Sequence, residues 1–153
     1  MSKSRELSNR LQEVIIDGTW IANTNFKNQL ETLSFKVVTQ KIKNYNTVAD
    51  LAQHIHYYIN GIKQVFNGGK LTIQDRYSFD FPPIKTQKDW DFFLNRFWKD
   101  TSELCELITQ LSDEKLNAVF VKQEYGTYAR NIEALIEHSY YHLGQITLLL
   151  KKE

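Results

Sequence analysis

The segment from residue 127 to residue 151 constrains the fold most, because its apolar residues recur at the three- and four-residue spacing of a helix with one buried face. That face holds Ile132, Leu135, Ile136, Ser139, Leu143, Ile146, Thr147 and Leu150. Thr127 is expected to be the N-cap, since its hydroxyl can accept a hydrogen bond from an amide of the first turn. The segment is therefore predicted to be one long helix.

Two histidines lie beside this apolar face. His138 and His142 are four residues apart, about 40° around the helix axis, so both imidazoles point to the same side. Histidines at this spacing can bind one metal ion. The alternative is that each is an ordinary histidine at the edge of the core with one hydrogen-bond partner. The spacing alone leaves both interpretations open.

Three further segments have a helical period, and two shorter ones have weaker signals. Long helices are predicted for residues 2–17, 47–66 and 86–111. Residues 24–40 fit one or two short helical turns, residues 112–116 a turn, and residues 117–126 an irregular segment with a short extended piece at 119–121. The sequence Thr47-Val-Ala-Asp50 is a capping box with Asp in place of Glu, and Asn67-Gly68-Gly69 is a strong stop signal.

Residues 70–85 have no helical period and contain Asp80-Phe81-Pro82-Pro83, which disfavours helix. The aromatic residues of this segment predict that it packs over the domain. About sixteen residues are long for a hairpin between antiparallel helices, so a crossover joining two parallel helices is expected. The prediction is one all-α domain over residues 1–153, a four-helix bundle with a long crossover between its second and third helices.

Composition narrows the classes of partner and compartment. The formal net charge is +1 with no basic stripe, so neither nucleic acid nor an anionic membrane surface is an expected partner. The single cysteine, Cys105, cannot form an internal disulfide, and we interpret it as a small buried apolar residue and not a nucleophile. The first residues do not resemble a signal peptide, and no apolar run reaches the ~18 residues of a membrane span. A cytoplasmic protein is expected.

The other two histidines lie in the helix predicted at residues 47–66. His54 is one step from Leu51 and Tyr58 on the helical wheel and therefore borders the core. His56 is about 200° away around the axis. It is expected to face elsewhere, as a surface or interface residue, and not to share a site with His54.

Two sequence stretches together carry a family resemblance. T-V-A-D-L-A-Q-H-I at residues 47–55, with L-I-E-H-S-Y-Y-H-L-G-Q-I at residues 135–146, resembles the DinB-like (YfiT-related) metalloproteins. The helix order, the crossover and the chain length agree with that superfamily. The resemblance implies a three-histidine metal site of His54, His138 and His142 with water in the remaining positions. It also implies thiol-dependent transferase or isomerase activity and a homodimer. Leu143 stands where the common pattern has Arg, which argues against a charge-binding role there.

Three neutral imidazoles leave a bound divalent cation with its full charge, which acidifies a bound water or polarises a thiolate or carbonyl. Zinc or nickel is the expected metal, with iron or manganese as alternatives. Asp50, one turn before His54, is the candidate for a catalytic base or a partner of the ligand. Tyr58 or Tyr141 is a candidate to line the pocket.

Two function classes follow. The first is a metal-dependent enzyme, a thiol-dependent transferase or hydrolase that acts on a small molecule, with a low-molecular-weight thiol as a candidate partner. The alternative is a non-catalytic metal-binding or dimerisation module of a stress response. Both use the same three histidines, and the sequence does not choose between them.

Overall fold

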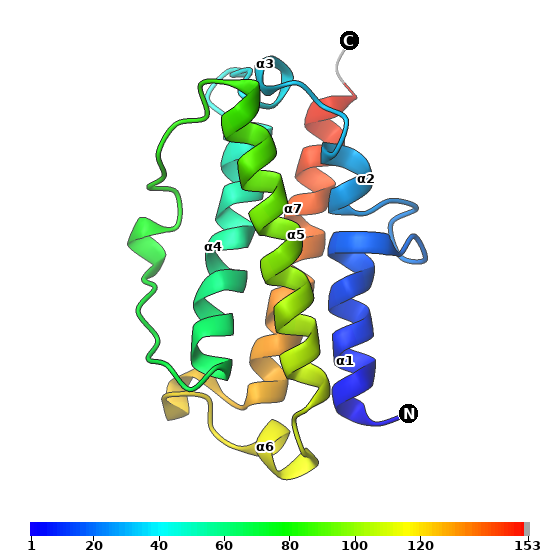
Figure 1. Cartoon of the computed structure of the whole chain (residues 1–153), viewed down its shortest axis with the longest axis vertical. Coiled ribbons are helices and arrows are strands. Elements are labelled where there is room, and N and C mark those ends of the chain that lie inside the picture. Colours follow the sequence, from blue (N-terminus) through cyan, green and yellow to red (C-terminus); the bar gives the residue numbers. More distant parts are fainter. Residues whose placement is uncertain (152–153) are drawn as a thin grey trace.

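The computed structural model describes residues 1–151, and every regular element in this range is helical (Figure 1). Four helices form the body of the molecule: α1 (Lys3–Gln12), α4 (Val48–Phe66), α5 (Gln87–Thr109) and α7 (Tyr128–Leu150). A π-helical turn, η1 (Glu13–Asp17), continues α1. The shorter elements are α2 (Phe26–Leu30), α3 (Phe35–Val38), α6 (Asp113–Asn117) and the 3₁₀ turns η2 (Asp75–Tyr77) and η3 (Gln123–Tyr125). The prediction of an all-α fold is confirmed.

The long helices begin where the sequence supplies caps. Thr47 accepts a hydrogen bond from the Asp50 amide at 3.0 Å, and the Asp50 carboxylate accepts one from the Thr47 amide at 2.8 Å. This is the capping box predicted at the start of α4. Thr86 and Asp89 form a second capping box at α5, and Thr127 caps α7 as predicted. Each cap satisfies amides that have no partner within the helix.

The apolar faces of the four long helices meet in one core. Helix α4 packs against α5 and α7, and α1 packs against the same two helices from the other side (Figure 1). The largest fully buried side chains are Trp90, Phe26, Phe97, Leu7, Leu11 and Ile15. Burying a side chain of this size contributes about 1.5–3 kcal/mol, so the core alone can hold the helices together. Cys105 is buried in it, and burial raises the pKa of its thiol to about 12, as expected for a residue that only packs.

Residues 67–86, hereafter the crossover segment, run along the outside of α4 from its C-terminal end to the start of α5 (Figure 1). Helices α4 and α5 therefore point in the same direction. Gly61 lets this segment lie close to α4, because a Cβ atom there would lie 2.6 Å from the side chain of Ile73. The hydroxyl of Tyr57 bonds both backbone groups of Gln74, at 3.0 and 2.9 Å. The segment covers the domain, as its aromatic residues predicted.

Within residues 1–151, no helix combines the length and the apolar character that crossing a bilayer requires. The stretch from Val119 to Val121 includes a single antiparallel bridge between Val119 and Thr127. This agrees with the short extended piece predicted there.

Candidate metal centre

Three histidines converge at the contact between α4 and α7. The Nε2 atom of His138 lies 3.2 Å from Nε2 of His54 and 2.8 Å from Nε2 of His142. All three can offer a ligand nitrogen, and these nitrogens lie within 4.8 Å of one another. The structure therefore brings together His138 and His142, which their spacing on one helix indicated, and His54, which the family resemblance added.

The hydrogen bonds of the outer ring nitrogens determine which nitrogens are free to bind. Nδ1 of His54 donates to the carbonyl oxygen of Ser78 at 2.9 Å, and Nδ1 of His142 donates to the side-chain oxygen of Gln145 at 2.7 Å. A carbonyl oxygen only accepts, so in each neutral ring the proton is on Nδ1 and the lone pair is on Nε2. Both lone pairs are directed toward the cluster, as in metal sites whose histidines are oriented by an outer partner.

Burial keeps the three rings neutral. Desolvation lowers the pKa of His54 and of His142, against an opposing contribution from their hydrogen-bond acceptors. Desolvation, together with the two neighbouring histidines, lowers the pKa of His138 to about 4. Because only neutral imidazole binds a metal ion, the cluster is in its ligand form at neutral pH.

Two of the three nitrogen separations, from His138 to His54 and from His138 to His142, fit one shared metal ion, and the third pair lies within 4.8 Å. Ligand nitrogens about 2.0–2.1 Å from a metal lie about 2.9 Å apart at a right angle and about 3.3 Å apart at a tetrahedral angle. The observed separations of 2.8 and 3.2 Å match these values. Three protein nitrogens would leave further coordination positions of a bound ion to water or another molecule.

Aromatic rings surround the cluster. Phe79 of the crossover segment stacks on His54, with ring centroids 4.1 Å apart and planes 8° apart. Tyr58 meets His54 and His138 edge-on, at 5.2 and 5.4 Å. Tyr141 lies 4.9 Å from His142 and is largely exposed. The two tyrosines proposed to line the pocket therefore both contact histidines of the cluster.

Two carboxylates, those of Asp50 and Asp75, bear on the question of a base or partner for the cluster. The carboxylate of Asp50 belongs to the capping box of α4, where it accepts a hydrogen bond from the amide of Thr47. Burial lowers the pKa values of His54 and His138, and the negative charge of Asp75 in the crossover segment opposes this lowering in part. Asp75 also accepts a hydrogen bond from Tyr58 at 2.7 Å. The structure thus gives Asp50 a role at the helix start and places Asp75 beside the site.

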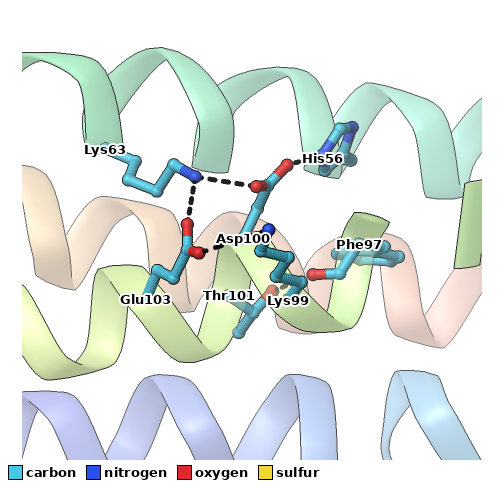
Figure 2. Close-up of polar contacts among 7 residues, drawn as sticks. All are labelled: His56, Lys63, Phe97, Lys99, Asp100, Thr101 and Glu103. Atoms are coloured by element: carbon cyan, nitrogen blue, oxygen red, sulfur yellow. Dashed lines mark hydrogen bonds and ion pairs between the residues drawn. The ribbon is translucent and has the colours of Figure 1, made fainter. Parts of the chain in front are cut away.

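His56 faces away from the cluster, as expected, but the expectation that it is a surface or interface residue is wrong. Its side chain is buried between α4 and α5, where Nε2 lies 2.6 Å from the carboxylate of Asp100. Lys63 reaches the other oxygen of Asp100 at 2.7 Å and Glu103 at 2.6 Å (Figure 2). The helical wheel placed His56 off the face of α4 that meets α7. Helix α5 covers the side of α4 that carries His56.

The positioning partners Ser78, Gln145 and Asp75 were not predicted. Gln145 is three residues after His142 and so lies on the same helix face, which is a signal that the sequence contains. Ser78 acts through its backbone carbonyl, and any residue type supplies one. Asp75 lies in a segment without regular period, so its place beside the site depends on the path of the crossover.

Comparisons with protein-family models, with curated proteins and with solved structures found no match for this chain. The fold and the site therefore define the class by themselves: an all-α protein with a buried cluster of three histidines that can hold a metal ion. The functional argument depends on the geometry of that cluster and on the groups around it.

Proposed function

We propose that the chain is a metal-dependent enzyme of the DinB-like kind, a four-helix bundle whose divalent ion is held by His54, His138 and His142. The observation that supports this is the convergence of three Nε2 atoms from two helices, two of them with lone pairs fixed by outer hydrogen bonds. A histidine that only packs in a core needs one hydrogen-bond partner. That need does not explain why three neutral imidazoles are directed at one point. Zinc or nickel suits three imidazoles best, with iron or manganese as alternatives.

A metal ion held by three neutral ligands supplies Lewis acidity toward a bound water, thiol or carbonyl. The residues of the chain supply the rest. Ser78 and Gln145 hold the rings of His54 and His142 in their binding orientation. Phe79 and Tyr58 pack against the ring of His54 and support its orientation. Asp50 fixes the start of α4 one turn before His54, and so acts in this proposal through the position of that helix.

The reaction class that suits this arrangement is transfer to or from a low-molecular-weight thiol, or hydrolysis of a small molecule. An experiment separates these from the non-catalytic alternative. The full chain is loaded with zinc or nickel and assayed on panels of thiol-transfer and ester or amide hydrolysis substrates. Turnover that requires metal and is lost in His138→Ala supports the enzyme. Stoichiometric metal without turnover on either panel favours a metal-binding module instead.

A homodimer belongs to the same proposal. Large apolar side chains are exposed on the monomer, among them Trp20 at 85%, Leu148 at 74% and Phe92 at 64% of their full areas. A two-fold interface would bury such residues with their symmetry mates. Sedimentation equilibrium at micromolar concentration tests this, since a mass of 18.1 kDa at all concentrations would contradict a dimer.

A further inference from the structure

A cavity of about 440 Å³, open to solvent on one side, lies between α4, the crossover segment, the residues before α7 and the first turn of α7. Its walls are Tyr58, Ile62, Leu71, Ile73, Gln74, Asp75, Phe120, Tyr125 and Asn131. This volume falls within the range of about 300–1,000 Å³ typical of small-molecule pockets. Most of the wall is aliphatic or aromatic, so the cavity favours a ligand with an apolar body.

The cavity adjoins the histidine cluster through Tyr58. One side of this residue lines the cavity, and its ring meets His54 and His138 edge-on at 5.2 and 5.4 Å. Its hydroxyl donates to Oδ1 of Asp75 at 2.7 Å, and Asp75 is also a wall residue. Tyr58 and Asp75 are therefore the polar wall residues that connect the cavity to the cluster.

Asp75 and Asn131 supply acceptors to a wall that also holds the amide of Gln74 and the hydroxyl of Tyr125. Asp75 is an exposed residue and the one wall residue with a formal charge, and the bond from Tyr58 uses only one of the roughly four acceptor positions of its carboxylate. Asn131 donates through Nδ2 to the carbonyls of Tyr125 and Thr127, at 2.7 and 2.8 Å, which leaves its Oδ1 as an acceptor. Acceptors with a negative charge call for a ligand that donates hydrogen bonds and carries a positive charge.

Two cationic side chains, Lys122 and Arg76, lie on aromatic rings of the same region. The ammonium of Lys122 lies 5.8 Å from the centre of the Tyr125 ring, so that ring already attracts a cation. The guanidinium of Arg76, next to Asp75 in sequence, stacks instead on Tyr77 at 4.6 Å. Neither cation is a wall residue, and each side chain is placed outside the cavity.

From the charge and shape of this cavity we infer that it binds a small protonated primary amine with an aromatic or aliphatic body. The ammonium group donates to Asp75, and the body lies against Ile62, Leu71 and Phe120. A molecule held in this way lies beside the three histidines, separated from them by Tyr58. Its role as a substrate rests on the proposed function, whereas its binding does not.

Three probes with similar bodies and different charges test the inference. Phenethylamine is cationic, phenethyl alcohol is neutral and hydrocinnamate is anionic. Each is titrated calorimetrically into the full chain, both loaded with zinc and after removal of metal by a chelator. We expect the amine to bind at least about tenfold more tightly than the alcohol, because it makes a charge-assisted hydrogen bond, and the anion to bind least.

Two matched variants locate the charge that discriminates. Asp75→Asn should reduce the affinity for the amine to that for the alcohol, while leaving the affinity for the alcohol unchanged. Asp80→Asn removes an exposed carboxylate of the same segment that is not a wall residue, and it should preserve the amine preference. Methyl chemical shifts of Leu71 and Ile73 should move on titration with the amine.

The outcomes are decisive. Equal affinities for the three probes, no binding of any of them, or an amine affinity unaffected by Asp75→Asn would each overturn the inference. Amine binding seen only in the zinc-loaded chain would mean coordination to the metal and would overturn it as well. A chain that binds the amine in the cavity but retains no metal would refute the proposed function and leave the cavity assignment intact.

Discussion

The Nδ1 atom of His142 lies 2.7 Å from Oε1 of Gln145, one turn further along α7. This bond fixes the orientation of the ring and the nitrogen that carries its proton, so its loss should weaken the site without removing a ligand. We expect Gln145→Ala to reduce metal affinity about 10- to 100-fold, the usual cost of losing an outer partner. Competition with a chromophoric chelator measures this.

Gln145→Glu is the matched control. It keeps an oxygen acceptor for Nδ1 and makes it negative, which raises the basicity of the ring, so metal affinity should be retained or increased. Loss of affinity in both variants to the same degree would show that the effect comes from packing and not from the hydrogen bond.

Asp100 is expected to be the most sensitive residue of the His56–Lys63–Asp100–Glu103 network. It accepts from both His56 and Lys63, and its side chain is only 12% exposed. Asp100→Ala should cost about 3 kcal/mol in the free energy of unfolding, because two buried donors lose their shared partner. Glu103, at 43% exposure, should cost less than about 1 kcal/mol when replaced by Ala.

Urea unfolding of the two variants gives this comparison, and elemental analysis should find their metal content unchanged. Equal costs for the two carboxylates would contradict the account of the network. So would loss of metal in Asp100→Ala while its helical circular dichroism is retained, since that would tie Asp100 to the site.

Two glycines within long helices should respond in opposite ways to the same substitution. Gly144 has open space where a Cβ would lie, so Gly144→Ala should stabilise the protein by about 0.5–1 kcal/mol. At Gly61 the new Cβ would lie 2.6 Å from the side chain of Ile73. Gly61→Ala should therefore destabilise, and the added substitution Ile73→Ala should remove the clash. A stabilisation by Gly61→Ala equal to that at Gly144 would show that the crossover segment is not packed as described.

Acid should destabilise the metal-free protein through its histidines. Burial lowers the folded-state pKa values of His54, His56 and His142, and it lowers that of His138 from 6.5 to about 4. In this window the unfolded chain binds more protons, so the free energy of unfolding falls as the pH is lowered from 6.5 toward about 4. Above the window the histidine contribution to stability is fully present.

Urea unfolding at a series of pH values measures this dependence. His138→Gln should flatten the curve, because it removes the histidine whose pKa burial lowers to about 4. Stability that rises on acidification between pH 6.5 and 4 would contradict neutral, buried histidines.

The helices could be predicted from the sequence because their signals are local. Thr47, Thr86 and Thr127 mark the starts of α4, α5 and α7, and apolar periodicity marks the buried faces. Two of the three clustered histidines are four residues apart on one helix, so a shared face is also a local property. His54 was added only by resemblance, because nothing in its own helix says which neighbour it will face.

What could not be predicted depends on contacts between distant segments. His56 was expected at the surface because the helical wheel of α4 was interpreted with a single buried face. In the structure α4 is covered on two sides, by α5 and by α7. Asp75 and Ser78 reach the cluster because the crossover segment follows α4 closely, and the absence of a side chain at Gly61 permits that path. No periodic pattern records such a contact.

The metal content of the purified protein and its four single histidine variants tests the central claim most directly. We expect about one divalent ion per chain in the wild type, measured by elemental analysis after dialysis. His54→Ala, His138→Ala and His142→Ala should each lose most of it while keeping their helical circular dichroism, since the core stabilises the fold. His56→Ala should retain it. Full metal content in all three site variants, or loss confined to His56→Ala, would contradict the assignment of the cluster as the metal centre.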